Sequence, residues 1–217
     1  MAIAPLLAQT TARRGYIAGF GEATVSVRPD LAKVNLGVLT QAPSANEAAT
    51  KNADQTSALI TALRAVLGAN ADVRTVSYSV NPTYTYPAGG QATLTGFQAS
   101  NMVQATMTDL GVIGRVIDVG VQAGANRIDG IQFGLKDDEP VRAQALRAAA
   151  QKAKAKVETI ASGLGVRTGA ILAADEGYQL SRVATASASL TAAAATPVES
   201  GTYDVRATVT LQVEVVQ

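Results

Sequence analysis

The closing segment of the chain limits the possible folds more than any other feature. From Tyr203 to Val215 every second residue is apolar or aromatic, and each residue between them is polar or charged. Successive side chains of a β-strand point to opposite faces, so this period of two predicts one long strand with one buried face. The run is longer than the usual strand of about five or six residues. We therefore expect it to extend beyond its own sheet.

Two segments near the start of the chain alternate in the same way. The odd positions of residues 17–27 are glycine or apolar, and the even positions of residues 32–38 are apolar. Each run predicts a strand with one buried face. The Pro29-Asp30 pair between them predicts a turn, so we expect the two strands to form a hairpin.

The middle of the chain predicts three more strands and a helix. Residues 75–80 alternate until an Asn-Pro pair, which ends the strand or restricts it to a sheet edge. Residues 91–107 predict a longer strand with a bulge, paired with the previous one as a hairpin. A largely apolar helix, which Asp109 can cap, is expected over residues 109–123, followed by a strand at 131–135. The order strand, helix, strand predicts a βαβ crossover.

The sequence also predicts two amphipathic helices. Ser44 and Glu47 have the spacing of a capping box, and Gly68 is a plausible end for the helix that follows. Acidic residues and a proline begin the longest helix, at residues 137–164. We predict that this helix buries a narrow, alanine-rich stripe, namely Leu146, Ala149, Ala153, Val157, Ile160 and Leu164.

Together these elements predict an α+β fold, in which about three helices pack on long antiparallel strands. A division into two subdomains is left open. We expect one domain over residues 15–217, preceded at residues 1–14 by the remnant of a secretion signal or by a disordered end. Residues 170–175 predict a short strand, and the Ala-, Ser- and Thr-rich residues 181–201 predict a loose loop. No run approaches the roughly 18 apolar residues of a membrane-spanning helix.

Composition excludes several classes of chemistry. The sequence contains no Cys, His or Trp. Disulfides, thiolate nucleophiles, a Ser-His-Asp triad, and His-ligated haem or zinc therefore cannot be built. The formal net charge of +1 provides no general attraction for nucleic acid.

Two motifs raise the question of ligand binding. Residues 19–24 superficially resemble a glycine-rich phosphate loop, but they lack the third glycine and lie within a strand pattern. Glycines there are better explained by a bulge or by close packing of another backbone. The acidic residues 137–139 could bind a hard cation, but their spacing does not match a calcium loop, and helix capping explains them better.

Three further groups of residues permit both a structural and a functional explanation. Tyr84 and Tyr86 flank a proline-containing loop, where they cover the edge of a core or anchor a partner. Ser162 with a nearby lysine, or a carboxylate pair, would permit hydrolysis, but nothing constrains either arrangement. The one basic cluster is explained by a solvated helix surface, with peripheral contact to anionic lipid or to a polyanion as the alternative: Arg142, Arg147, Lys152, Lys154 and Lys156. We assign no catalytic, cofactor-binding or metal-ligating residue.

Several motifs follow one another in a characteristic order from about Gly15 to the end of the chain. They are Gly19-Phe20-Gly21-Glu22-Ala23 with Val27-Arg28-Pro29-Asp30, Tyr78-Ser79-Val80-Asn81-Pro82-Thr83-Tyr84, Gly96-Phe97-Gln98-Ala99-Ser100-Asn101, and Gly124-Ala125-Asn126-Arg127-Ile128-Asp129-Gly130-Ile131-Gln132-Phe133, followed by the closing strand.

In this order the motifs resemble the SIMPL-domain family, which includes periplasmic immunogenic proteins and proteins linked to oxidative-stress defence. The resemblance implies secretion to the bacterial envelope and ring-like or channel-like homo-oligomers, and it supplies no catalytic residues. The chain departs from the family pattern in its low-complexity segment at residues 184–195. Met102 and Met107 would make a poor oxidant scavenger, so any protective role is expected to be indirect.

Three hypotheses follow. The first is a non-catalytic, self-assembling protein of the periplasm or cell exterior, which forms a ring-, cage- or channel-like homo-oligomer after removal of its signal peptide. The second is an envelope module that binds a peptide, a lipid headgroup or a protein partner at an exposed strand edge. The third is a cryptic hydrolase, which would need a pocket with convergent carboxylates or lysines of perturbed pKa.

Overall fold

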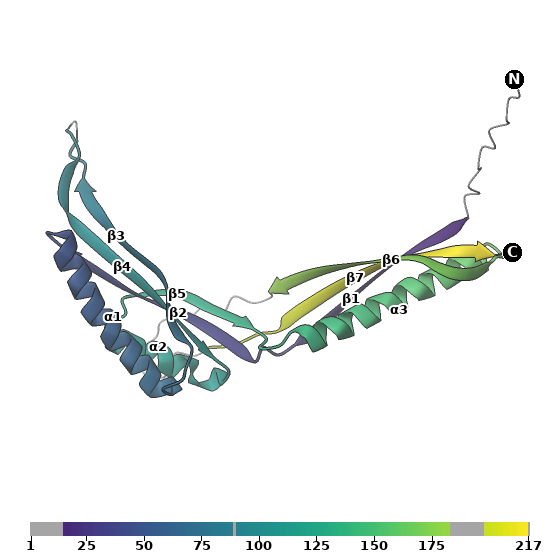
Figure 1. The fold of residues 1–217 in the computed structure, drawn as a ribbon, viewed down its shortest axis with the longest axis horizontal. Coiled ribbons are helices and arrows are strands. Elements are labelled where there is room, and N and C mark those ends of the chain that lie inside the picture. Colours follow the sequence, from purple (N-terminus) through teal and green to yellow (C-terminus); the bar gives the residue numbers. More distant parts are fainter. Residues whose placement is uncertain (1–14, 89, 183–197, 217) are drawn as a thin grey trace, which may run out of the picture. The chain divides into compact units, whose positions relative to one another are not determined.

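The computed structural model describes residues 15–88, 90–182 and 198–216 (Figure 1). Each of its two compact units combines an antiparallel sheet with at least one helix packed on it, which confirms the predicted α+β class. The units are formed by segments distant in sequence. Among the described residues, the terminal unit comprises 15–26, 138–181 and 204–216, and the central unit comprises 27–137, 182 and 198–203.

The terminal unit contains a three-stranded sheet and the longest helix. The strand that closes the chain lies in the middle of the sheet, and its alternate residues from Val205 to Val213 are buried, as the period of two predicted. The order of the sheet is β1-β7-β6. The elements are β1 (Tyr16–Val27), α3 (Glu139–Gly163), β6 (Arg167–Arg182) and β7 (Tyr203–Val216).

Two glycines of β1 allow the sheet and the helix to approach each other closely. A Cβ atom at Gly21 would lie 2.0 Å from the Ala149 carbonyl oxygen, and one at Gly19 would lie 2.7 Å from the Ala153 carbonyl oxygen. Such distances leave no room for a side chain at either position. The motif at residues 19–24 is therefore a packing motif within a strand, as expected, and not a phosphate loop.

The central unit contains a four-stranded antiparallel sheet with helices on one face. Helix α1 packs on three of the four strands of this sheet, and a second helix packs against α1 (Figure 1). Branched apolar side chains between the helices and the sheet form the core. The order of the sheet is β3-β4-β2-β5. The elements are β2 (Leu31–Ala42), α1 (Ala45–Leu67), β3 (Val73–Thr85), β4 (Thr93–Met107), η1 (Leu110–Val112), α2 (Ile113–Gln122) and β5 (Arg127–Gly134).

Several predicted local signals are confirmed in this unit. The Ser44 hydroxyl accepts a hydrogen bond from the Glu47 amide at 3.3 Å, and Gly68 ends α1 with a positive φ of 100°. Strand β3 is an edge strand that continues through Pro82, and it forms the predicted hairpin with β4, with shifts of register between them. Strands β4 and β5 both run antiparallel to β2. The predicted crossover therefore joins two parallel strands that are separated by β2.

The motif at residues 124–133 ties the end of α2 to the sheet. The Asn126 side chain accepts a hydrogen bond from the Leu39 amide and donates one to the Leu39 carbonyl, both at 2.8 Å. It thus imitates the backbone of a neighbouring strand. Gly124 has a φ of 108° and Gly130 one of 95°, conformations that side-chain-bearing residues rarely adopt. This backbone path explains the residues of the motif that precede β5, Gly124 to Asn126, and it also explains Gly130 within β5.

Three predictions about elements were wrong. Strands β1 and β2 do not form a hairpin, because they belong to different sheets. No tight turn joins them: the Asp30 carboxylate accepts a hydrogen bond from the Lys136 amide at 2.7 Å, and the Asp30 amide donates to the Gly134 carbonyl at 3.1 Å. The predicted short strand at residues 170–175 is the 16-residue β6. This strand also includes the first two residues of the predicted loop 181–201, of which residues 183–197 lie outside the described residues.

The third error concerns the buried stripe of α3. Its buried residues recur every four positions and are Ala145, Ala149, Ala153, Val157 and Ala161. Ile160 and Leu164, which the prediction placed in the stripe, are exposed. The close approach of β1 explains the difference, since small side chains suit the narrow interface and larger ones lie outside it.

Candidate functional site

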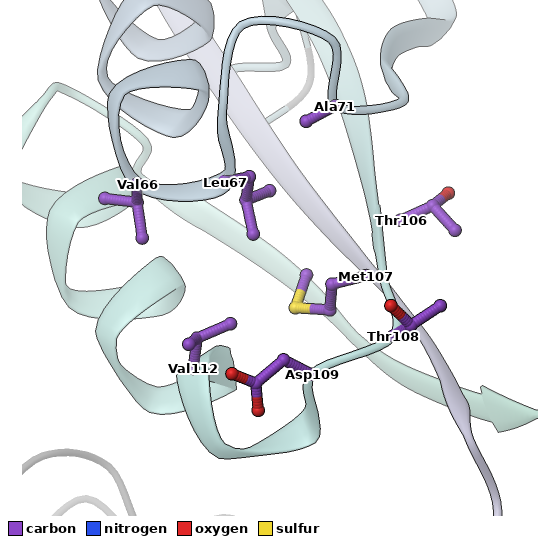
Figure 2. Close-up of a pocket in the computed structure, with 8 residues that line it drawn as sticks. All are labelled: Val66, Leu67, Ala71, Thr106, Met107, Thr108, Asp109 and Val112. Carbon is purple, nitrogen blue, oxygen red and sulfur yellow. The ribbon is translucent and has the colours of Figure 1, made fainter.

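A pocket of about 360 Å³ lies where the end of α1, the end of β4 and η1 meet (Figure 2). Figure 2 shows the Met107 thioether directed between Leu67 and Val112, with the Asp109 carboxylate at the side of the pocket formed by η1. The walls are mainly apolar. The lining residues are Val66, Leu67, Ala71, Thr106, Met107, Thr108, Asp109 and Val112.

The chemistry of this pocket is limited. Asp109 is the only ionisable residue among the eight that line it, and its Oδ1 atom accepts a hydrogen bond from the Gly111 amide at 2.9 Å. The carboxylate thus caps η1, as the sequence predicted for Asp109. General acid–base catalysis of hydrolysis usually requires a second convergent group, and the lining does not supply one.

A smaller depression of about 320 Å³ lies on the terminal unit. Arg206 of β7 and Glu22 of β1 form an ion pair there, and Thr208 donates a hydrogen bond to the Gly177 carbonyl at 3.2 Å. Tyr178, which also lines the depression, donates a hydrogen bond to Glu176 at 3.2 Å. Burial raises the pKa of Tyr178, and the negative charge of Glu176 raises it further. The sequence did not predict the ion pair between Glu22 and Arg206, because the two residues are 184 positions apart and alternation within β1 and β7 does not show which strands are paired.

The most unusual surface of the terminal unit is strand β6. Every residue from Arg167 to Tyr178 is exposed or half-buried, although the strand belongs to a sheet. Ile171 and Leu172 point to opposite faces and are 64% and 44% exposed. A helix is only about 10 Å wide and strands lie about 4.8 Å apart, so one helix covers about two strands. Because α3 packs on β1 at Gly19 and Gly21, no helix of the described residues covers β6 at the far edge of the sheet.

Other exposed apolar side chains lie elsewhere on the terminal unit. Leu164 and Ile160 of α3 are exposed, as are Tyr16 and Phe20 of β1. The Lys156 ammonium lies 5.7 Å from the centre of the Phe20 ring, within the range of a cation–π contact. We call Ile171 and Leu172, which lie in the outer strand of this sheet, the apolar edge of the terminal unit.

The remaining candidate residues from the sequence do not lie together in one site. Asp138 forms an ion pair with Arg142 at 2.7 Å on the first turn of α3, and within the described part of the chain no group of three potential ligands is placed to hold a metal ion. Lys152, Lys154 and Lys156 are exposed along α3, with Lys154 3.8 Å from Glu158. These contacts are those of a solvated helix.

Both tyrosines beside the proline-containing loop are exposed, Tyr84 at 49% and Tyr86 at 76%. They therefore do not cover the edge of a core. Ser162 lies exposed in the last turn of α3. Met102 and Met107 are both buried.

The model of the SIMPL family, described as proteins of unknown function (DUF541), matches residues 17–213. The chain belongs to this family. The 26 kDa periplasmic immunogenic protein of Brucella melitensis is 30% identical over 174 residues, which cover 77% of this chain and 69% of that protein. The uncharacterized protein YggE of Escherichia coli K12 is 24% identical over 156 residues, 72% of this chain and 63% of that protein. No helix within the described ranges is long and apolar enough to span a membrane.

Proposed function

We propose that this chain is a non-catalytic, self-assembling protein of the bacterial envelope that forms a closed homo-oligomer of ring, cage or channel type. The observation that carries the proposal is the uncovered strand β6, with apolar residues on both of its faces. The name of the Brucella relative, a periplasmic immunogenic protein, supports a periplasmic location.

The physical argument begins with the edge of the sheet. A strand at an edge presents a row of unpaired amide and carbonyl groups, and an exposed apolar edge favours association with another chain. Proteins that remain monomeric usually protect such edges with charge, proline or a short strand. Strand β6 has 16 residues, and its first half contains Ala170, Ile171, Leu172, Ala173 and Ala174. Contact between copies would cover this segment.

The symmetry of the contact between copies determines whether the assembly closes into a ring. A contact between different surfaces of identical chains produces a ring if the rotation closes, and an open fibre if it does not. The apolar edge and the exposed face of β1, with Tyr16 and Phe20, are two different surfaces of the same unit. We infer that they are parts of such contacts. Any contribution to oxidative-stress protection would then be structural, because the sequence has no Cys and Met102 and Met107 are buried.

Variants of the apolar edge test the proposal. We expect the double variant Ile171→Glu, Leu172→Glu to yield smaller particles than the unmodified chain in size-exclusion chromatography with light scattering. The matched control is Val121→Glu, Ile128→Glu, which changes two similarly exposed apolar residues of the central unit. Circular dichroism verifies that all variants are folded. An unchanged particle mass for the edge variant would refute the proposed contact.

The same edge favours a second candidate function, an envelope module that binds an extended peptide by strand addition. In that case the free chain would be a monomer, and β6 would pair with the peptide through its backbone. A monomeric chain that saturably binds an apolar peptide, with binding lost in the edge variant, would favour this function over self-assembly.

A further inference from the structure

The β3–β4 hairpin ends in a two-stranded ribbon that extends beyond the rest of the central unit. Strand β2 pairs with β4 only as far as Phe97, whereas β3 and β4 pair with each other as far as Thr85 and Thr93. Helix α1 also stops short, since Ala48 in its first turn packs at the level of Phe97. Figure 1 shows the end of the hairpin projecting past the start of α1. We call residues 82–95, of which the structure describes all but residue 89, the hairpin tip.

The hairpin tip carries no charged residue. Asp, Glu, Lys and Arg are absent from residue 75 to residue 108, although they make up 16% of the whole chain. The first charged residues of α1, Glu47 and Lys51, form an ion pair with each other at 2.8 Å. Exposed edges and turns of proteins in water usually carry charged side chains. An uncharged projecting end is therefore suited to surroundings other than water.

Aromatic and apolar side chains are exposed on this uncharged tip. Tyr84 lies directly opposite Leu94, so both side chains are on the same face of the ribbon. They are 49% and 50% exposed, and Tyr86 at the start of the turn is 76% exposed. A tyrosine ring can lie on the apolar side of a boundary between water and hydrocarbon while its hydroxyl group stays on the polar side, and tyrosine is enriched at such boundaries for this reason.

Several polar groups of the tip already have partners within the hairpin. The Thr95 hydroxyl donates a hydrogen bond to the Thr83 carbonyl at 3.0 Å, and the Gly90 amide donates one to the Pro87 carbonyl at 3.0 Å across the turn. Proline has no amide hydrogen, so Pro82 and Pro87 remove two donors that would otherwise need a partner. Removal from water is costly mainly for polar groups without a partner. The tip can therefore leave water at a lower cost than an ordinary loop.

We propose that the hairpin tip inserts into the interface of a lipid bilayer, with Tyr84, Tyr86 and Leu94 as its anchors. A protein partner would cover one side of the ribbon and leave the other side free to carry charge, as the polar rim of a protein interface does. A bilayer surrounds a projecting end and disfavours charge on all of its sides. The absence of charge therefore favours a bilayer over a protein partner or a second copy.

The insertion is shallow. The outer edges of a two-stranded ribbon have unpaired amide and carbonyl groups, which hydrocarbon cannot satisfy. The anchors therefore lie at the level of the lipid headgroups and the first part of the acyl chains. The inference goes beyond self-assembly and does not rest on it.

A fluorescent reporter at the tip tests the insertion. The chain has no tryptophan, so Tyr86→Trp in the full chain introduces a single one. Phosphatidylcholine vesicles should shift its emission to shorter wavelength, and lipids brominated near the headgroup should quench it. Tyr78→Trp is the matched control, because Tyr78 lies in β3, is 54% exposed and is roughly 25 Å behind the tip at the spacing of strand residues. Interfacial insertion reaches only about 5–10 Å, so the emission of the control should not change.

Truncated side chains measure the contribution of the anchors. A single myristoyl chain binds membranes with a constant of about 10⁴ M⁻¹, and three partly exposed side chains present less apolar surface, so we expect half-maximal binding near about 1 mM lipid in vesicle flotation. Tyr86→Ser with Leu94→Ser should weaken binding by about tenfold or more. The control Val76→Ser with Tyr78→Ser truncates two similarly exposed side chains in the body of β3 and should leave binding within about twofold. Circular dichroism verifies that both variants are folded.

Salt and lipid charge separate insertion from attraction to a basic surface. The exposed lysines of α3 would bind only anionic vesicles and would release them at high salt. Insertion of the uncharged tip should be equally strong at low and high salt and should not need anionic lipid.

Three results would each overturn the proposal. The first is that phosphatidylcholine vesicles at about 5 mM lipid do not bind the chain. The second is that the emission of the Tyr78→Trp chain shifts as much as that of the Tyr86→Trp chain. The third is that the emission of the Tyr86→Trp chain is already at short wavelength without lipid, as in a contact between copies.

Discussion

Gly21 lies where β1 contacts α3, and the substitution Gly21→Ala tests how the terminal unit is packed. The added Cβ would lie 2.0 Å from the Ala149 carbonyl oxygen and 2.4 Å from the Ala153 amide nitrogen. Both are backbone atoms of a helix, so neither can turn aside as the tip of a side chain could. The helix would have to move away from the sheet by about 1 Å or more, and packing around it would loosen.

The cost can be estimated from this geometry. One extra methyl group in a well-packed interior typically costs about 1–3 kcal/mol. Replacement of glycine in a strand returns about 0.5–1 kcal/mol of conformational entropy. Because the obstacle is backbone, we expect the upper part of the range, a net loss of about 2 kcal/mol or more for the terminal unit.

Urea unfolding followed by circular dichroism at 222 nm measures this loss, at one fixed protein concentration for all variants. Gly163→Ala is the matched control, because it adds the same methyl group to the last residue of α3, where no atom lies within 4 Å of the new Cβ. The control should be neutral or slightly stabilising. A Gly21→Ala chain that unfolds within about 0.5 kcal/mol of the unmodified chain would refute the packing argument.

Two other predictions concern the hydrogen bonds of each unit. Asn126→Ala removes both bonds to the Leu39 backbone and should lower the free energy of unfolding of the central unit by about 1–3 kcal/mol, measured by the same urea titration; an unchanged midpoint would contradict the role of Asn126. The pKa of Tyr178 is raised, so its contribution to stability is present below about pH 10 and is lost as the pH rises through the folded-state pKa. Absorbance at 295 nm should show a late-forming tyrosinate that Tyr178→Phe removes, whereas an identical titration of the variant would exclude the shift.

Much of the fold could be predicted, because apolar residues recur with a clear strand or helix period in most segments. The closing strand, the capping box at Ser44 and the cap at Asp109 are local patterns, and the structure confirms each of them. Pairing between distant strands was harder to predict. Strands β1 and β2 are adjacent in sequence, and nothing local to Pro29 and Asp30 revealed that β1 pairs with β7 at the other end of the chain.

The candidate surfaces were harder still to predict. The length of β6 was underestimated because its residues show no alternation of apolar and polar types, and those from Arg167 to Tyr178 are exposed or half-buried on both faces. Similarly, the amides of Asn35 and Gln104 are 69 positions apart, and only the register of β2 and β4 brings them together. Period and capping are properties of a short segment, whereas an open edge and the contacts between side chains of neighbouring strands are properties of the whole sheet.

The particle mass of the full chain in solution tests self-assembly most directly. Light scattering after size exclusion, over a range of concentrations, should give one discrete mass that is a multiple of 22.1 kDa and is stable on dilution. A uniform 22.1 kDa particle at micromolar concentration would contradict the assembly proposal and favour a module that binds its partner at β6.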